Sequence, residues 1–190
     1  MEKATITEDR MQGSIFVLLR RFVESLYGYS TWVNLREAAG IEHAPYQMDE
    51  TYPTSEIAAI IGKASKLVGV PPHQLMEQFG ESLVPDLLMI YKKHMHPEWR
   101  TYDMLLNTEA AMHAAVRKED SRATPPLLLV TKKGSRQLIV DYYSRRRMAA
   151  VAVGIIRGIT RHYDESDKVE VTLLTPVGEE RVQIRVDFLP

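Results

Sequence analysis

Apolar residues recur at intervals of three and four along the N-terminal part of the chain, which is the spacing of amphipathic helices. This pattern predicts a helix from Gln12 to Leu26 and another from Thr54 to Gly69. A shorter helix is expected from about Ser30 to Gly40. The segment 43–53 contains two prolines and several polar residues, so we expect a connecting loop there.

Prolines punctuate the middle of the chain. Pro71 and Pro72 predict the start of a helix that ends near Gly80, and Pro85 is expected to mark a break or a new first turn. After these breaks, the apolar spacing over 102–116 again predicts a helix.

The spacing of apolar residues changes after Pro126. Segments 127–131 and 137–142 predict a hairpin, and segments 168–173 and 181–188 predict a second one. Between them, 148–162 returns to helical spacing. That helix carries small residues that permit close packing: Ala149, Ala150, Ala152, Gly154 and Gly158. The predicted fold class is α+β, with a helical N-terminal lobe and a C-terminal lobe built on a roughly four-stranded antiparallel sheet.

Composition narrows the possible functions. The 190 residues are 45% hydrophobic and 26% charged, and the formal net charge is −1, so one globular domain is expected and nucleic-acid binding is not. The absence of cysteine excludes disulfides, thiolate catalysis and iron–sulfur clusters. Residues 1–10 predict a polar tail rather than a signal peptide, and no apolar run is long enough for a membrane span. We therefore expect a cytoplasmic protein.

Candidate chemistry gathers in the C-terminal half. Tyr142, Ser144 and Arg146 are spaced by two, so on a strand they would direct a phenol, a hydroxyl and a guanidinium to one face. Such a group suits a pair of carboxylates, because arginine holds carboxylate oxygens two at a time. His113 stands on an apolar helix face, where Ala110 and Ala114 would leave room for a flat ligand.

One ligand combines these requirements, because haem iron is commonly bound by imidazole and haem carries two propionates. Plainer interpretations exist for each residue. His113 could be an ordinary helix residue, and the triplet could be a solvated strand end. Only Arg146 keeps the phase of the triplet, so Arg145 and Arg147 are expected to face solvent.

The order of His113, the Ala-Thr-Pro-Pro segment 123–126 and the Tyr-x-Ser-x-Arg triplet resembles the haem-nitric oxide/oxygen binding (H-NOX) family. Segments 11–15, 26–28, 69–71 and 79–80 extend the resemblance. It implies one haem b domain over residues 11–190, with a distal lobe about 11–68, a proximal lobe about 69–190 and the haem between them.

The same resemblance implies that His113 ligates the iron and that the propionates are bound by Tyr142, Ser144 and Arg146. Pro126 presses on the porphyrin and distorts it, so Pro126→Ala is expected to flatten the haem.

The resemblance also bears on which gas is bound. In relatives that bind O₂, a distal tyrosine supported by Trp and Asn donates to the bound gas; the matching positions here are Val151, Leu19 and Leu83, all apolar. We therefore expect a ferrous haem that binds NO and CO and excludes O₂. Three further apolar positions are expected to contact the haem: Ile15, Leu87 and Ile155.

The expected function is a haem-based gas sensor, not an enzyme, that signals to a separate partner. The resemblance implies that this partner is a histidine kinase, a cyclic-nucleotide or cyclic-dinucleotide enzyme, or a chemotaxis receptor. Two alternatives stay open: a haem-free interaction domain of the same fold, and a haem enzyme acting on peroxide or NO, against which the apolar distal residues argue. Elsewhere, His94 and His96 are expected to lie on a surface loop, and Glu109 is expected to be a surface residue.

Overall fold

The computed structural model describes residues 9–119 and 124–190, so most of the predicted tail 1–10 and the predicted Ala123 lie outside the described residues. The chain divides into two compact units. The first unit comprises Met1–Gly69 and Arg122–Thr124, and the second comprises Val70–Ser121 and Pro125–Pro190.

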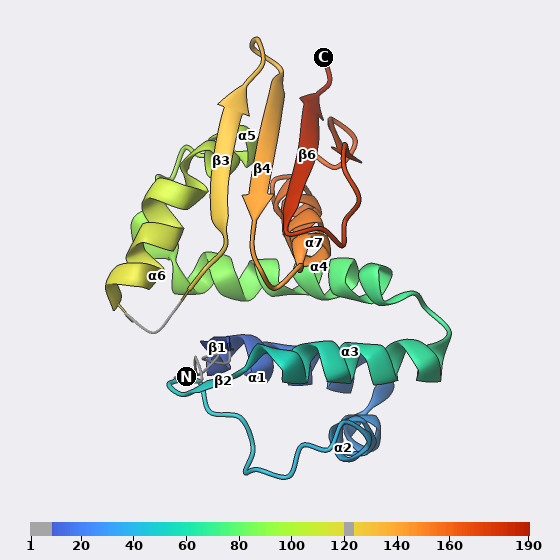
Figure 1. Ribbon diagram of the computed structural model, residues 1–190. Helices are drawn as coiled ribbons and strands as arrows, with labels where there is room; N and C mark the ends of the chain where they lie inside the picture. The colour runs from blue at the N-terminus through green and yellow to red at the C-terminus, as the bar shows by residue number, and fades with distance from the viewer. Residues whose placement is uncertain (1–8, 120–123) are drawn as a thin grey trace, which may run out of the picture. The chain divides into compact units, whose positions relative to one another are not determined.

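The first unit is helical, as its apolar spacing predicts. It contains α1 (Gly13–Tyr27), α2 (Tyr29–Ala38) and α3 (Thr54–Val68) (Figure 1). Gly28, with φ of 85°, separates α1 from α2, and Gly69, with φ of 70°, ends α3; both adopt a conformation that favours glycine.

The first unit also contains a small sheet that the sequence does not predict. Strands β1 (Arg10–Gln12) and β2 (Thr51–Pro53) pair antiparallel, although Arg10 fell in the expected tail and β2 in the expected loop. Three-residue strands are too short to show an alternating pattern, which is why the sequence does not reveal them.

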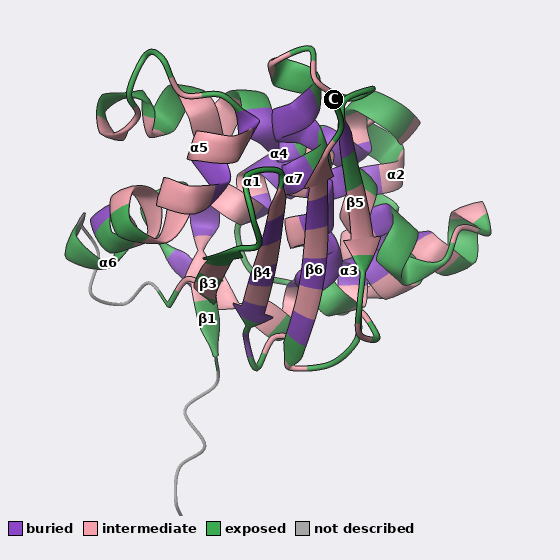
Figure 2. Ribbon diagram, turned by 90° about the horizontal axis from the view of Figure 1, so that it is seen from above, coloured by how far each residue is buried: buried purple, intermediate pink, exposed green. Residues whose placement is uncertain are grey.

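The second unit contains the predicted four-stranded antiparallel sheet. Its strands are β3 (Leu127–Lys132), β4 (Gln137–Tyr143), β5 (Val169–Leu173) and β6 (Arg181–Phe188), in the order β3-β4-β6-β5. Buried residues alternate with partly exposed ones along β4 and β6, as Figure 2 shows. One face of the sheet therefore carries the core.

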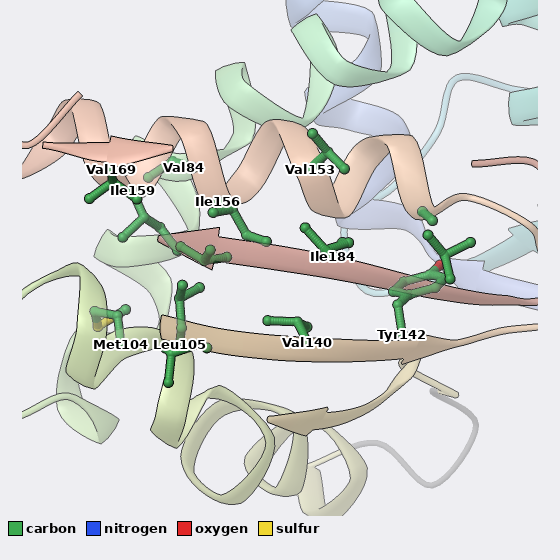
Figure 3. Packing of buried hydrophobic residues seen from close by; sticks show 14 residues of the cluster. Val84, Met104, Leu105, Val140, Tyr142, Val153, Ile156, Ile159, Val169 and Ile184 are labelled. Carbon is green, nitrogen blue, oxygen red and sulfur yellow. The ribbon is translucent and has the colours of Figure 1, made fainter. Parts of the chain in front are cut away.

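The core of this unit joins the sheet to helix α7 (Ala149–His162). Figure 3 shows Val153 and Ile156 of the helix above Val140 of β4 and Ile184 of β6. All four are at most 4% exposed, so this layer removes most of its apolar surface from water.

Helix α4 (Pro72–Ile90) overturns the prediction of an end near Gly80 and a break at Pro85. It runs through both residues. Gly80 is needed for close packing, because a Cβ there would lie 2.1 Å from the carbonyl oxygen of Val151 in α7. Pro85 is exposed and leaves the buried side of the helix in contact with α7.

The predicted helix over 102–116 is present but is not one regular helix. It consists of α5 (Thr101–Asn107), a π-helical turn η2 (Thr108–His113) and α6 (Ala114–Glu119). A short 3₁₀ turn, η1 (Lys92–His94), lies upstream. Side-chain periodicity cannot distinguish a π turn from an α turn over six residues, so the π turn is not visible in the sequence.

None of the helices within the described ranges is long and apolar enough to cross a membrane.

Candidate functional site

The candidate site in the second unit is built from the helical segment that carries His113, the start of β3, and the turn after β4. The described residues of this unit include His113, Pro126 and the Tyr142, Ser144 and Arg146 triplet. Their placement can therefore be followed within one compact body.

His113 ends the π-helical turn, and its side chain is only 17% exposed. Its Nδ1 lies 3.0 Å from Oε2 of Glu109, and the backbone carbonyl of Pro126 also faces the ring. Burial lowers the pKa of His113 below 6.5, and this effect outweighs the nearby carboxylate, which acts to raise it. At neutral pH the ring is therefore an uncharged imidazole, the form that binds metals.

Glu109 is not the surface residue that we expected. Its Oε2 accepts the backbone N–H of Leu128 at 3.0 Å, and Oε1 receives the guanidinium of Arg117. Burial acts to raise the pKa of Glu109, but hydrogen bonds from His113, Arg117 and Leu128 lower it below 4.5. The side chain is thus an ionised carboxylate with several donors around it.

The π-helical turn contains both Glu109 and His113. π turns are rare and frequently occur at functional sites. This one interrupts the helix where the candidate ligand stands, and Thr108 Oγ1 donates to the carbonyl of Met104 at its start. The expected neighbours of the histidine, Ala110 and Ala114, are both exposed, so they leave the outer side of the helix open.

The triplet gathers for a reason other than the one predicted. Strand β4 ends at Tyr143, so only Tyr142 lies on the strand, and alternation along a strand does not place the other two. A turn does so instead: the Arg146 backbone N–H donates to Ser144 Oγ at 3.2 Å, and the Arg147 N–H donates to the Ser144 carbonyl at 3.2 Å.

Tyr142 and Ser144 are buried, and Arg146 is partly exposed. Burial raises the pKa of the Tyr142 phenol, while a hydrogen bond with Ser144 and the positive charge of Arg146 oppose the rise. The hydroxyl of Ser144 and the guanidinium of Arg146 thus both act on the Tyr142 phenol. Arg145 and Arg147 are exposed, as expected.

The apolar positions fall in both units. In the second unit, Leu83 and Leu87 lie on α4, and Val151 and Ile155 lie on α7. Leu83 is 2% exposed and the other three are partly exposed. In the first unit, both Ile15 and Leu19 lie on α1, and Leu19 is fully buried.

His94 and His96 show no metal-site geometry. His94 is partly buried, with its ring centroid 6.5 Å from that of Tyr91, and His96 is exposed. Over residues 9–119 and 124–190, no group of three or more histidine, cysteine or acidic side chains is arranged to hold a metal ion.

Comparison with known proteins agrees with these features. Residues 12–172 match the family model described as haem-NO-binding. A curated relative, the soluble guanylate cyclase gcy-31 of Caenorhabditis elegans, is 24% identical over 161 residues, which are 84% of this chain. The chain spans only 23% of that relative's length.

Solved structures share the fold. An H-NOX protein from S. oneidensis in the Fe(II)NO state has a TM-score of 0.87 at 20% identity, covering 95% of this chain and 100% of that chain. The Fe(II) unliganded H-NOX protein from K. algicida has a TM-score of 0.82 at 22% identity, covering 95% and 97%. The S. oneidensis domain in the Fe(II)CO state has a TM-score of 0.81 at 20% identity, covering 94% and 98%.

The family model covers most of the chain, and the predicted α+β fold is confirmed by these structures. The chain therefore belongs to the haem-NO-binding, or H-NOX, family and is distantly related to the sensory domain of soluble guanylate cyclase.

Proposed function

We propose that this H-NOX domain binds haem b with His113 as the iron ligand. The observation that carries the proposal is the environment of the ring: it is largely buried, uncharged at neutral pH and engaged at Nδ1 by a carboxylate. A carboxylate can only accept, so Nδ1 carries the hydrogen and the lone pair of Nε2 is the one offered to iron. This donor set fits a haem.

We propose that Tyr142, Ser144 and Arg146 bind the haem propionates. The turn after β4 assembles a phenol, a hydroxyl and a guanidinium, and together these can donate to two carboxylates. Pro126, whose carbonyl faces the His113 ring, is proposed to press on the porphyrin. We further propose a distal lobe about 11–68 and a proximal lobe about 69–190.

Haem supplies the ferrous iron at which a gas binds. We propose that this chain binds NO and CO and excludes O₂. Support comes from the hydrocarbon side chains at Leu19, Leu83 and Val151, which offer no hydrogen bond to stabilise the negative charge that develops on bound O₂. The S. oneidensis relatives were solved with NO and with CO, which supports the same two ligands here.

We propose that gas binding would weaken the bond between His113 and the iron. The domain would then shift between two states that a separate partner distinguishes. Three partner classes follow from the family: a histidine kinase, a cyclic-nucleotide or cyclic-dinucleotide enzyme, and a chemotaxis receptor. A cytoplasmic location is part of this proposal.

The first test is the absorption spectrum of the anaerobically reduced protein, alone and with NO, CO or air. We expect one Soret band that moves with NO and CO and does not move with O₂. No Soret band after haem reconstitution would overturn haem binding and favour a haem-free interaction domain of this fold. A band that moves in air would overturn the gas selectivity alone.

Ligation is tested by His113→Ala, which should abolish the Soret band of the purified protein. His96→Ala is the matched control, because His96 is exposed on the same unit, and it should retain the band. Equal haem content in the two variants would exclude His113 as the ligand.

Selectivity is tested by Val151→Tyr, which adds a phenol donor on α7. We expect the spectrum of this variant to change in air, whereas Val33→Tyr, at an exposed position on α2, should behave as wild type. An unchanged spectrum of Val151→Tyr in air would remove Val151 from the distal wall.

A further inference from the structure

Glu109 connects three elements of the second unit through one carboxylate. Its Oε2 lies 3.0 Å from His113 Nδ1, one turn away on η2, and 3.0 Å from the backbone nitrogen of Leu128 on β3. Its Oε1 contacts Arg117 of α6. The carboxylate therefore ties the histidine to Leu128, which follows Glu109 by 19 residues in the sequence.

The contact with Leu128 has a structural reason. Among the strands that the structure describes, β3 is an edge strand, since it pairs with β4 alone in the order β3-β4-β6-β5. N–H groups on the outer side of an edge strand have no neighbouring strand to accept them. Glu109 accepts one of them, which places its carboxylate at a fixed point beside the sheet.

The contact with His113 has a chemical consequence. Free neutral histidine exchanges its hydrogen between the two ring nitrogens, but a carboxylate accepts only from the nitrogen that carries the hydrogen. The geometry thus holds the hydrogen on Nδ1. A carboxylate partner also makes the opposite ring nitrogen a stronger ligand.

We propose that Glu109 is a positioning residue for the iron ligand: it fixes the tautomer and orientation of His113, strengthens its bond to iron and anchors it to strand β3. This inference rests on the proposed function, in which His113 ligates haem. Partners of this kind typically change metal affinity 10- to 100-fold when they are removed. Arg117 donates to the other oxygen of the carboxylate, Oε1.

Two variants distinguish the hydrogen bond that Glu109 accepts from the negative charge that it carries. Glu109→Ala removes the acceptor, whereas Glu109→Gln keeps an amide oxygen that can still accept from Nδ1 but carries no charge. Glu98→Gln is the matched control, because Glu98 is an exposed carboxylate on the same unit. Near-UV circular dichroism confirms that each variant is folded.

The holo-protein is examined by resonance Raman spectroscopy and by haem transfer to apomyoglobin. We expect the iron–histidine stretching frequency to fall in Glu109→Gln and to fall further in Glu109→Ala. We also expect haem loss about 10-fold faster in Glu109→Ala and unchanged in Glu98→Gln. A frequency and a rate that stay at the wild-type values in both Glu109 variants would overturn the proposal.

A second readout needs no haem. In the full chain labelled with ¹⁵N-histidine and prepared without haem, we expect His113 to carry its hydrogen on Nδ1 in wild type and in Glu109→Gln, and to lose this preference in Glu109→Ala. A hydrogen on Nε2 in wild type would overturn the positioning role. Absence of a Soret band from wild-type protein would instead refute the proposed function. The ¹⁵N measurement would still show whether Glu109 sets the tautomer of His113.

Discussion

Gly154 lies where helix α7 comes closest to helix α4. An ideal Cβ at this position would lie 2.0 Å from the carbonyl oxygen of Glu77 and 2.9 Å from the backbone nitrogen of Glu81. Both atoms belong to the α4 backbone, so no side chain can rotate away from the added methyl group. Gly154→Ala must therefore push the two helices apart.

The size of the effect follows from this distance. The contact has to lengthen from 2.0 Å to at least 3.0 Å, below which Cβ atoms essentially never approach another atom, so the helices separate by about 1 Å. A gap of that size forfeits a quarter to a half of the attraction between the atoms that line it. Overpacking of this kind costs about 3 kcal/mol, and alanine returns about 1 kcal/mol of helix propensity.

We therefore expect Gly154→Ala to lower the free energy of unfolding by about 2 kcal/mol, which for a chain of this length lowers Tm by about 4–8 °C. The assay is urea and thermal unfolding followed by far-UV circular dichroism. Gly62→Ala is the control, because Gly62 is inside helix α3 and a Cβ there meets nothing within 4 Å. It should gain about 0.5–1 kcal/mol. A Gly154→Ala variant as stable as wild type would refute the close approach of the helices.

Three further predictions concern single side chains. Glu165 accepts the Thr101 N–H and the Arg100 guanidinium at the start of α5; burial acts to raise its pKa, but these bonds lower it below 4.5. Its contribution is thus complete above the unfolded-state pKa and is lost as pH falls through the folded-state pKa, so in urea unfolding wild type should exceed Glu165→Gln by about 1 kcal/mol at pH 7 and converge with it once the pH lies below the folded-state pKa. Arg146→Ala should speed haem transfer to apomyoglobin about 10-fold, equivalent to about 1.4 kcal/mol, whereas an equal effect of the exposed Arg145→Ala would contradict a specific propionate contact. Pro126→Ala should shift the reduction potential of the iron in a spectroelectrochemical titration, and an unchanged potential would exclude pressure on the porphyrin.

The elements that the sequence predicts well are those whose burial is one-sided. Helices α1 and α3 each bury one face, so their apolar residues recur at helical spacing, and β4 and β6 alternate because one face of the sheet is covered. Predictions from single residue types were wrong where tertiary contacts determine the end of a helix. Gly80 and Pro85 are helix breakers in isolation, yet α4 continues through both because it packs against α7.

The triplet shows how a spacing argument can group residues for the wrong reason. Strand alternation was expected to align Tyr142, Ser144 and Arg146, but β4 ends before Ser144, and a turn brings Arg146 back to the serine hydroxyl. Arg147 adopts φ of 54° immediately after this turn, a conformation that few non-glycine residues adopt and that periodicity does not report. The path of the backbone at Arg146 thus depends on a turn that only the structure reveals.

Glu109 was expected to be a surface residue, although one of its contacts has a signal in the sequence. It precedes His113 by four residues, the spacing at which helical side chains meet, so the pair could have been inferred from the sequence. The contact of Glu109 with the Leu128 N–H has no sequence signal, because this N–H lies on an edge strand that follows two prolines. A carboxylate one turn from a candidate metal ligand should therefore be weighed as the partner of the second ring nitrogen, because a neutral buried imidazole requires an acceptor there whatever the surrounding fold.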